Sequence, residues 1–333
     1  MIERIGNCRI VEEIGSGGMA VIYKAVQESL NRTVAVKALK ASVAQDSQFA
    51  IRFEREALSV SSLQHENIIH IYDFHKVGGQ LFIVMEFVEG IDLYDLLEKC
   101  PILPPEVAAI VALQVARGLD YAHYRGIIHR DIKPANIMIG HHGEVMLMDW
   151  GIAKRAGTVS TEPAGALVGT PAYMSPEQAR GEPDLDARSD LYSAMVVFHE
   201  LLALGHYLED EHNLPRLIER IQHPHGSAAA LCASFSLHQS GIPAELGHIL
   251  AKGLQVRKEH RFPSAEELIA RLEATLDGSF PIQCPMTCMK RVTRGFGRGI
   301  DGHPTLALLA AVALIALVGF ALVQLVSVVA IRS

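Results

Sequence analysis

The first 88 residues alternate between short apolar runs and turn-forming residues. The runs are rich in β-branched side chains and span residues 9–15, 20–26, 33–39, 67–74 and 81–88. Runs of this length that are bounded by glycine and asparagine turns are typical of β-strands. Residues 48–63 differ, because their apolar side chains recur at helical spacing among charged ones. The pattern predicts a small sheet with one amphipathic helix packed against it.

Beyond Gly90 the apolar positions follow a longer period, which is typical of helices. The segments with this spacing are 92–99, 104–126, 190–204, 215–222 and 244–254. A β-rich first region followed by a larger, mainly α-helical region predicts an α+β fold.

A long apolar segment lies near the C-terminus. Residues 305–331 contain no charged residue, and about 20 apolar residues suffice to cross a ~30 Å hydrocarbon core. The basic residues on its flanks are Lys290, Arg291, Arg294 and Arg298 before it and Arg332 after it. The positive-inside rule then predicts a single-pass transmembrane helix, with residues 1–304 in the cytoplasm and the C-terminus outside. Residues 278–304, rich in glycine, proline and basic residues, are expected to form a juxtamembrane linker.

The charge of the chain bears on its partners. The formal net charge is −7 at pH 7, and the acidic excess lies in the part before the linker. An acidic surface argues against nucleic acid as a partner.

A glycine-rich segment lies between two predicted strands. It reads Gly15-Ser16-Gly17-Gly18-Met19-Ala20, and residues without a large side chain let backbone N–H groups approach phosphate oxygens. A plain hairpin turn is the alternative for this segment taken alone. A dinucleotide fold would need a helix after the glycines, whereas a strand follows.

Further motifs occur in a fixed order after the glycine segment. They are Val34-Ala35-Val36-Lys37, then HRDIKPAN at 129–136, Asp149-Trp150-Gly151, and GTPAYMSPEQ at 169–178. This combination resembles the eukaryotic-like (Hanks-type) serine/threonine protein kinases of bacteria, over roughly residues 8–275. The resemblance implies a bilobal kinase domain at 8–277, with an N-lobe at about 8–88 and a C-lobe at about 89–277. The resemblance to bacterial kinases also implies that the apolar helix at 305–331 is anchored in the bacterial cytoplasmic membrane.

The resemblance also implies catalytic roles. Asp131 would accept or orient the proton of the substrate hydroxyl, and Lys133 would contact the γ-phosphate of ATP. Asn136 and Asp149 would bind Mg²⁺ or Mn²⁺, which prefer oxygen ligands. Lys37 would pair with Glu56 on the predicted helix and meet the α- and β-phosphates; Glu54, on another face of that helix, is the rival partner.

The nucleotide site follows from the same likeness. Met85 would stand at the gatekeeper position, and the backbone of Glu86 and Val88 would bind the adenine edge. The remaining residues expected around ATP are Ile14, Gly15, Ser16, Gly17, Gly18, Met19, Ala20, Ile22, Ala35 and Lys37.

Residues 149–177 would form the activation loop. Its hydroxyls include Thr158, Ser160 and Thr161, and Arg130 would bind a phosphate placed on one of them. Autophosphorylation in trans would need two copies of the chain to meet, as in a homodimer, and a membrane anchor would favour that meeting. A Ser/Thr-rich surface loop without a regulatory role is the alternative.

Two structural carboxylates complete the resemblance, and three residues depart from it. Glu177 is expected to pair with Arg261, and Asp190 is expected to brace the backbone of the catalytic loop. The departures are Ala20 for the third loop glycine, Trp150 for the usual phenylalanine, and Met195 for a usual glycine.

Two other classes of function compete with an active protein kinase. A membrane-anchored pseudokinase or scaffold would usually have lost one of the catalytic residues, and all are present here. A small-molecule kinase would lack GTPAYMSPEQ, the segment expected to hold a peptide beside the acceptor hydroxyl. The sequence therefore predicts an ATP-dependent serine/threonine protein kinase that acts on protein substrates.

Overall fold

The computed structural model describes residues 3–18, 20–44, 47–150, 154–155, 170–208, 211, 213–222 and 241–280, with backbone alone for some positions near 42–59 and at 154–155. Residues 1–280 form one compact unit, and residues 281–333 form a second unit that lies outside the described residues. The predicted membrane helix at 305–331 and most of the predicted linker belong to that second unit. Within the described ranges, no helix is both long enough and apolar enough to span a membrane.

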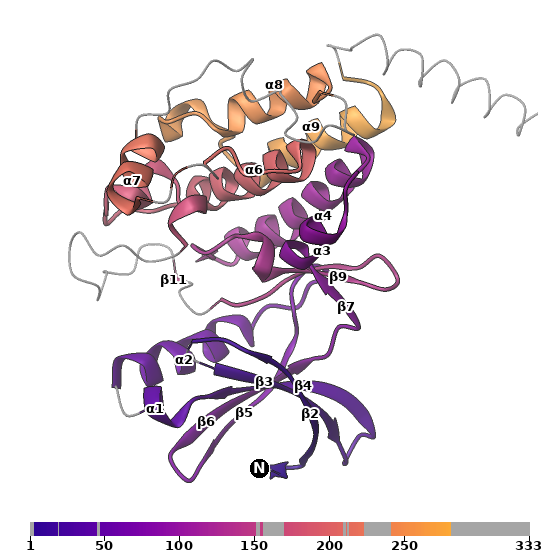
Figure 1. Cartoon of the computed structure of the whole chain (residues 1–333), viewed down its shortest axis with the longest axis vertical. Helices are drawn as coiled ribbons and strands as arrows, with labels where there is room; N and C mark the ends of the chain where they lie inside the picture. The colour runs from indigo at the N-terminus through magenta and orange to yellow at the C-terminus, as the bar shows by residue number, and fades with distance from the viewer. Residues whose placement is uncertain are drawn as a thin grey trace, which may run out of the picture. The chain divides into compact units, whose positions relative to one another are not determined.

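The N-terminal lobe is a six-stranded antiparallel sheet in the order β1-β2-β3-β4-β6-β5 (Figure 1). Its strands are β1 (Arg4–Ile5), β2 (Cys8–Ser16), β3 (Ala20–Gln27), β4 (Arg32–Leu39), β5 (Ile71–Val77) and β6 (Gln80–Glu86). Two helices follow β4, namely α1 (Ala41–Ala44) and α2 (Ser47–Val60). The predicted sheet with one long amphipathic helix is thus confirmed.

The two faces of this sheet carry different side chains because strand residues alternate between faces. Val34, Val36 and Val84 belong to one apolar cluster, whereas Phe53 and Ala57 of α2 belong to the main core on the other face. The strand register identifies the residues on the second face. Lys37 lies opposite Ile22 on β3 and Ile83 on β6, and Ala35 lies opposite Met85. The residues expected around the nucleotide therefore share the face that also receives α2.

The second lobe is mainly helical. Its helices are α3 (Leu93–Lys99), α4 (Pro105–Tyr124), α5 (Pro176–Ala179), α6 (Ala187–Ala203), α7 (Leu214–Gln222), α8 (Ala244–Gly253) and α9 (Ala265–Asp277). Helix α4 packs against α6 and α9 (Figure 1). The bilobal fold expected from the sequence is therefore present.

Short β-strands of the second lobe flank the HRDIKPAN segment. Strands β7 (Gly90–Asp92), β9 (Ile137–Gly140) and β10 (Val145–Leu147) form a three-stranded sheet, and β8 (Ile127–Ile128) pairs with β11 (Lys154–Arg155). A 3₁₀ turn at Pro134–Asn136 precedes β9. The HRDIKPAN segment thus runs from the end of β8 to the start of β9.

The strand expected at 67–74 begins later than predicted, at Ile71. The residues before it are tied to β10 of the helical lobe: Leu147 N donates to Asn67 O (2.9 Å) and Ile69 N donates to Leu147 O (3.0 Å). A tertiary contact distant in sequence therefore overrides the local strand propensity of these isoleucines.

Met195, one of the departures from the family pattern, is fully buried in α6. The space for its side chain comes from Gly253 at the end of α8, where an added Cβ would collide with the Met195 side chain. The bulkier residue in α6 is accommodated because its neighbour is a glycine.

Candidate active site

The catalytic loop is held by a buried carboxylate, as predicted for Asp190. Asp190 is 1% exposed; its Oδ2 accepts from His129 N and its Oδ1 accepts from Arg130 N, each at 2.8 Å. These bonds fix the loop at Arg130, whose φ of 71° is uncommon for a residue with a side chain. A third bond, from His123 Nε2 at 2.8 Å, comes from α4 and was not anticipated.

Asp190 is charged in this setting. Burial raises the pKa of its carboxyl, but the hydrogen bonds from His123 and from the backbone N–H of Arg130 outweigh burial and lower the net pKa. An ionised carboxylate only accepts hydrogen bonds, so Nε2 of His123 is the donor in their contact.

Asp131 lies among three polar side chains. Lys133 Nζ is 2.9 Å from Asp131 Oδ2, and Asn136 Nδ2 donates to the same oxygen at 3.1 Å and to the Asp131 carbonyl at 2.8 Å. On the other side, Thr170 Oγ1 lies 3.2 Å from Asp131 Oδ1 and 2.8 Å from Lys133 Nζ. A hydroxyl can therefore be bound by the aspartate and the lysine together.

Asp149 lies across from this cluster and contacts the other lobe. Its Oδ1 is 2.9 Å from Lys37 Nζ, and its φ of 58° is in the left-handed region. Burial raises the pKa of the Asp149 carboxyl, but the charge and hydrogen bond of Lys37 outweigh burial, so the net pKa is lowered. The side chain of Asp149 remains 47% exposed.

The donor set suits a hard divalent cation. Asn136 uses its amide nitrogen on Asp131, so its amide oxygen is left as a ligand, and Asp149 bonds Lys37 through only one of its carboxylate oxygens. Two oxygen ligands from separate loops leave room for water and phosphate oxygens, as Mg²⁺ prefers.

His129 and Trp150 pack beneath these residues. Their ring centroids are 4.3 Å apart, and both side chains are buried. Burial lowers the pKa of His129, so the ring is neutral: Nε2 donates to Met148 O (3.0 Å) and Nδ1 accepts from Asp131 N (3.3 Å). Trp150, which stands in place of the usual phenylalanine, therefore packs beside His129.

The glycine segment forms the turn between β2 and β3. Gly17 N donates to Ala20 O at 2.9 Å, and Lys40 Nζ donates to Gly17 O at 2.6 Å. An added Cβ at Gly15 or Gly18 would meet no heavy atom within 4 Å, so the space beside the backbone is open to a ligand. Ile14 is 46% exposed, Ser16 ends β2, and Met19 lies outside the described residues.

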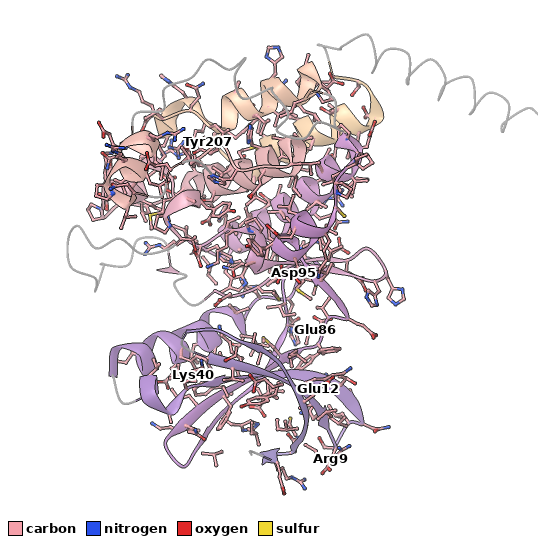
Figure 2. The ribbon with its side chains drawn as sticks, viewed as in Figure 1. Arg9, Glu12, Lys40, Glu86, Asp95 and Tyr207 are labelled. Atoms are coloured by element: carbon pink, nitrogen blue, oxygen red, sulfur yellow. The ribbon has the colours of Figure 1, made fainter. Side chains whose placement is uncertain are left out.

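The segment from Met85 to Val88 connects the lobes. Glu86 lies at their junction (Figure 2), where its N–H donates to His70 O at 2.8 Å. Met85 and Val88 are both half-buried. The Glu86 N–H is thus already used, which leaves its carbonyl and the Val88 backbone as groups for an adenine edge.

Several predicted site residues lie outside the described part of the chain. The Glu56 side chain lies outside the described residues, so its pairing with Lys37 stays a prediction, while the rival Glu54 is exposed on α2. The activation-loop hydroxyls Thr158, Ser160 and Thr161 also lie outside them.

A buried ion pair holds the segment after Thr170. Arg261 Nη1 and Nη2 bond Glu177 Oε1 and Oε2, each at 2.7 Å, with side-chain exposures of 0% and 2%. Ser189 adds a third hydrogen bond to Glu177 at 2.7 Å. The predicted pair is confirmed, and neighbouring Gln178 donates to Arg130 O (2.9 Å), which links this segment to the catalytic loop.

Comparisons with known proteins agree with this geometry. Residues 8–271 match the protein kinase domain family. The chain is 36% identical over 301 residues to a probable serine/threonine-protein kinase of Streptomyces coelicolor, an alignment that covers 89% of this chain and 43% of that protein. Over 272 residues it is 35% identical to the serine/threonine-protein kinase PrkC of Bacillus subtilis, covering 82% of this chain and 41% of PrkC.

A third relative is the serine/threonine-protein kinase PknB of Mycobacterium leprae, which is 35% identical over 273 residues, 80% of this chain and 43% of PknB. The matched part thus spans less than half the length of these relatives. The fold and the site are those of a bilobal kinase domain. The chain belongs to the protein kinase family.

Proposed function

We propose that this chain is an ATP-dependent serine/threonine protein kinase, which transfers the γ-phosphate of ATP to Ser or Thr hydroxyls of proteins. The observation that carries the proposal is the Thr170 hydroxyl between Asp131 (3.2 Å) and Lys133 (2.8 Å). An acceptor hydroxyl in a similar position would give its proton to the Asp131 carboxylate. The relatives named above are serine/threonine kinases, which supports the choice of acceptor.

The residues of the chain have distinct parts in this reaction. Asp131 orients the acceptor and takes its proton, and Lys133 lies beside the same oxygen to stabilise charge on the transferred group. Lys37, on the sheet, would bind the α- and β-phosphates, with Glu56 as its partner. The glycine turn and the Met85–Val88 segment would enclose the rest of the nucleotide.

Asn136 and Asp149 are the residues that would hold a divalent cation, Mg²⁺ or Mn²⁺. When bound, the cation would neutralise charge on the β- and γ-phosphates. The chain's own contribution is to keep two oxygen ligands facing the space beside Asp131.

Transfer of ³²P from γ-labelled ATP to a basic protein substrate tests the proposal. Wild-type protein should transfer phosphate, and Asp131→Asn and Lys37→Met should each abolish most of the transfer. The result that would favour the scaffold alternative is ATP binding by wild type without transfer to the substrate or to the chain itself.

Autophosphorylation of the activation loop is a further part of the proposal. A phosphate on Thr161 or a neighbour would attract Arg130 and order the loop, and two copies on one membrane would reach each other readily. A variant without the hydroxyls of Thr158, Ser160 and Thr161 should have reduced activity. Full activity of that variant would contradict this step.

The membrane anchor rests on hydropathy and flanking charge. We propose that residues 305–331 cross the cytoplasmic membrane once, with the kinase domain in the cytoplasm. Cell fractionation of the full chain and of a variant ending at Asp277 tests it. The full chain should be in the membrane fraction and the shortened one should not, whereas an identical distribution would contradict the anchor.

A further inference from the structure

The glycine turn between β2 and β3 has a cation bonded to its backbone. Lys40 Nζ donates to Gly17 O at 2.6 Å, a short distance that is typical of an ionised donor. Lys40 is half-buried and lies between the end of β4 and the beginning of α1 (Figure 2). Among the described residues no carboxylate forms an ion pair with it, so the carbonyl of the turn is the group that holds this ammonium.

The Lys40 side chain comes from the face of the sheet opposite to the expected nucleotide face. Ala38 belongs to the apolar cluster on one face, whereas Leu39 belongs to the main core on the other face, which also carries Lys37. Lys40 directly follows Leu39, so the alternation of side chains along β4 places it on the side of Ala38. The ammonium therefore approaches the glycine turn from the side away from the expected nucleotide.

The hydrogen bonds of the turn leave one backbone donor unused. The Gly17 N–H donates to Ala20 O at 2.9 Å, and the Gly17 carbonyl accepts from Lys40. Among the described residues, the Gly18 N–H has no hydrogen-bond partner. An added Cβ at Gly18 would meet no heavy atom within 4 Å. The turn thus presents the Gly18 N–H beside open space.

The geometry of the peptide group links the bound carbonyl to the unused donor. The Gly17 carbonyl and the Gly18 N–H belong to one planar trans peptide, so they point in opposite directions. A peptide between two glycines would otherwise rotate freely, because neither residue has a Cβ to restrict it. By holding the carbonyl on the far side, Lys40 turns the N–H toward the nucleotide side.

We propose that Lys40 is a positioning residue for the phosphates of the nucleotide. Its bond to Gly17 O orients the Gly17–Gly18 peptide, so that the Gly18 N–H donates to a phosphate oxygen. The inference rests on the proposed ATP-dependent reaction and gives Lys40 a role different from that of Lys37. Lys37 would meet the phosphates itself, whereas Lys40 acts through the backbone and orders the turn before the ligand binds, which reduces the entropy lost on binding.

The Gly18 amide can be observed selectively, because the chain has two Gly-Gly pairs, Gly17-Gly18 and Gly78-Gly79. Full-length protein in detergent micelles, deuterated and labelled with ¹³C and ¹⁵N in glycine alone, should give two signals in an HNCO spectrum, those of the Gly18 and Gly79 amides. The probe is AMP-PNP with Mg²⁺, an ATP analogue that resists phosphate transfer. It should move the Gly18 amide proton of wild type downfield, as a hydrogen bond to an anionic oxygen does, whereas adenosine should not. Gly79, in the turn between β5 and β6, is the internal reference.

Variants of Lys40 test the cause of this shift. Lys40→Met removes the donor, so the downfield shift at saturating AMP-PNP should be largely lost. Lys40→Arg keeps a charged donor and should keep the shift. Lys76→Met, at an exposed residue of β5 whose side chain has no described partner, is the matched control and should behave as wild type.

The affinities for the same ligands, measured by isothermal titration calorimetry, give a second readout. Lys40→Met should weaken AMP-PNP binding about three- to tenfold, which is the worth of one hydrogen bond. Its affinity for adenosine should be unchanged, because adenosine has no phosphate. A variant that merely damaged the sheet would weaken the binding of both ligands.

Three results would overturn the proposal. A Gly18 shift at saturation that is the same in wild type and Lys40→Met would show that Lys40 does not orient this peptide. Equal weakening of AMP-PNP and adenosine would show a general structural role instead. Wild type that fails to bind AMP-PNP would refute the proposed kinase function and this inference with it, so the two kinds of failure are distinguishable.

Discussion

The two sides of the candidate active site are built differently. On the helical side, buried charged groups hold the backbone: Asp190 is 1% exposed, and the Glu177–Arg261 pair is 0% to 2% exposed in its side chains. On the sheet side, the described ion pair of Lys37 is with Asp149, a residue whose side chain is 47% exposed. The glycine turn there is open on the side of Gly15 and Gly18.

The difference indicates which groups hold each side of the site in its conformation. Charges buried with full sets of hydrogen bonds fix the acceptor side before any ligand arrives, as electrostatic catalysis requires. The nucleotide side has open backbone and an exposed carboxylate, which phosphates and a cation can complete. We therefore expect changes on the helical side to reduce stability, and changes on the sheet side to reduce catalysis alone.

The largest loss of stability is expected when the buried ion pair is broken. Glu177→Gln leaves the Arg261 guanidinium buried beside a neutral amide, which should cost about 3–5 kcal/mol of the free energy of unfolding. Urea unfolding monitored by circular dichroism measures this loss. The control is Glu28→Gln, which breaks exposed pairs with Arg4 and Arg9 and should cost less than about 1 kcal/mol. Equal losses in the two variants would contradict the comparison.

Asp190→Asn should have the next largest effect. The amide keeps one acceptor but turns an NH₂ group toward the backbone donors of the catalytic loop, so about 1.5–3 kcal/mol of stability should be lost. Because Asp131 lies on that loop, kcat should fall at least about tenfold, by misplacement, with little change in KM for ATP. Steady-state kinetics measure both constants. Asp95→Asn, at an exposed residue paired with Lys99, should leave kcat unchanged; a normal kcat in Asp190→Asn would refute the bracing role.

The pH dependence of stability should reflect the same buried carboxylates. The pKa values of Glu177 and Asp190 are lowered in the folded protein, so between the folded and unfolded pKa values the unfolded chain binds more protons. Their contribution is fully present above the ordinary carboxyl pKa of about 4 and is lost as the pH falls through the folded values. Buried His129, whose pKa is lowered, should already reduce the urea midpoint below about pH 6.5, because the unfolded chain binds its proton there. The carboxylates should add a steeper fall below about pH 4, and this second fall should be shallower in Glu177→Gln. A fall of the same steepness in that variant would exclude Glu177 as a source.

The smallest effect on stability is expected for Lys37→Met. The Lys37–Asp149 pair is partly solvated, so its loss should cost no more than about 1 kcal/mol, while phosphate transfer should fall by orders of magnitude. The combination of a near-normal urea midpoint with lost transfer is the signature to look for. A large loss of stability would show that the sheet side is as dependent on its charges as the helical side.

Much of this arrangement could be predicted from the sequence, because local patterns and motif spacing carry it. The strands, α2, the Glu177–Arg261 pair and the role of Asp190 all followed from residues in a recognisable order. The third partner of Asp190, His123, was missed because an isolated histidine near the end of α4 has no signal of its own.

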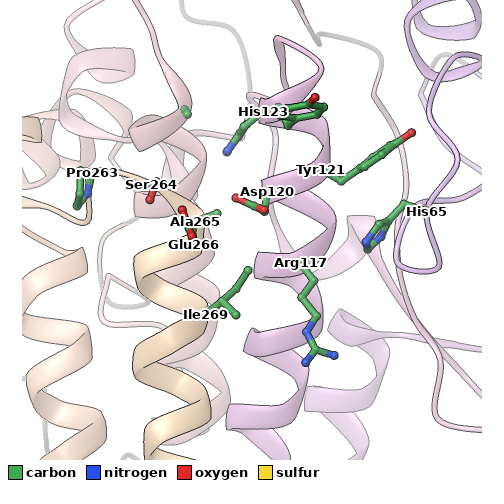
Figure 3. A pocket seen from close by; sticks show the side chains of 12 residues that line it. His65, Arg117, Asp120, Tyr121, His123, Pro263, Ser264, Ala265, Glu266 and Ile269 are labelled. Carbon is green, nitrogen blue, oxygen red and sulfur yellow. The ribbon is translucent and has the colours of Figure 1, made fainter.

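Contacts between distant segments were also beyond the sequence. Strand β5 begins late because Asn67 and Ile69 bond Leu147, and Met195 fits because Gly253 lies beside it. A cavity beside α4 and α9 is lined by residues far apart in the sequence, such as His65, Arg117 and Ile269 (Figure 3), so no single stretch of residues predicts it. Such features depend on tertiary packing, which hydrophobic periodicity and secondary-structure propensity do not encode.

Asp131 is proposed to act on the acceptor hydroxyl, and a comparison of wild type with Asp131→Asn tests this role. ATP binding and ³²P transfer to a Ser/Thr protein substrate are measured on the same preparations of wild type and Asp131→Asn, in Mg²⁺ or Mn²⁺. We expect unchanged ATP binding and a loss of transfer of about 10²-fold or more, the range for a positioned acid or base. Equal transfer by the two proteins would contradict it.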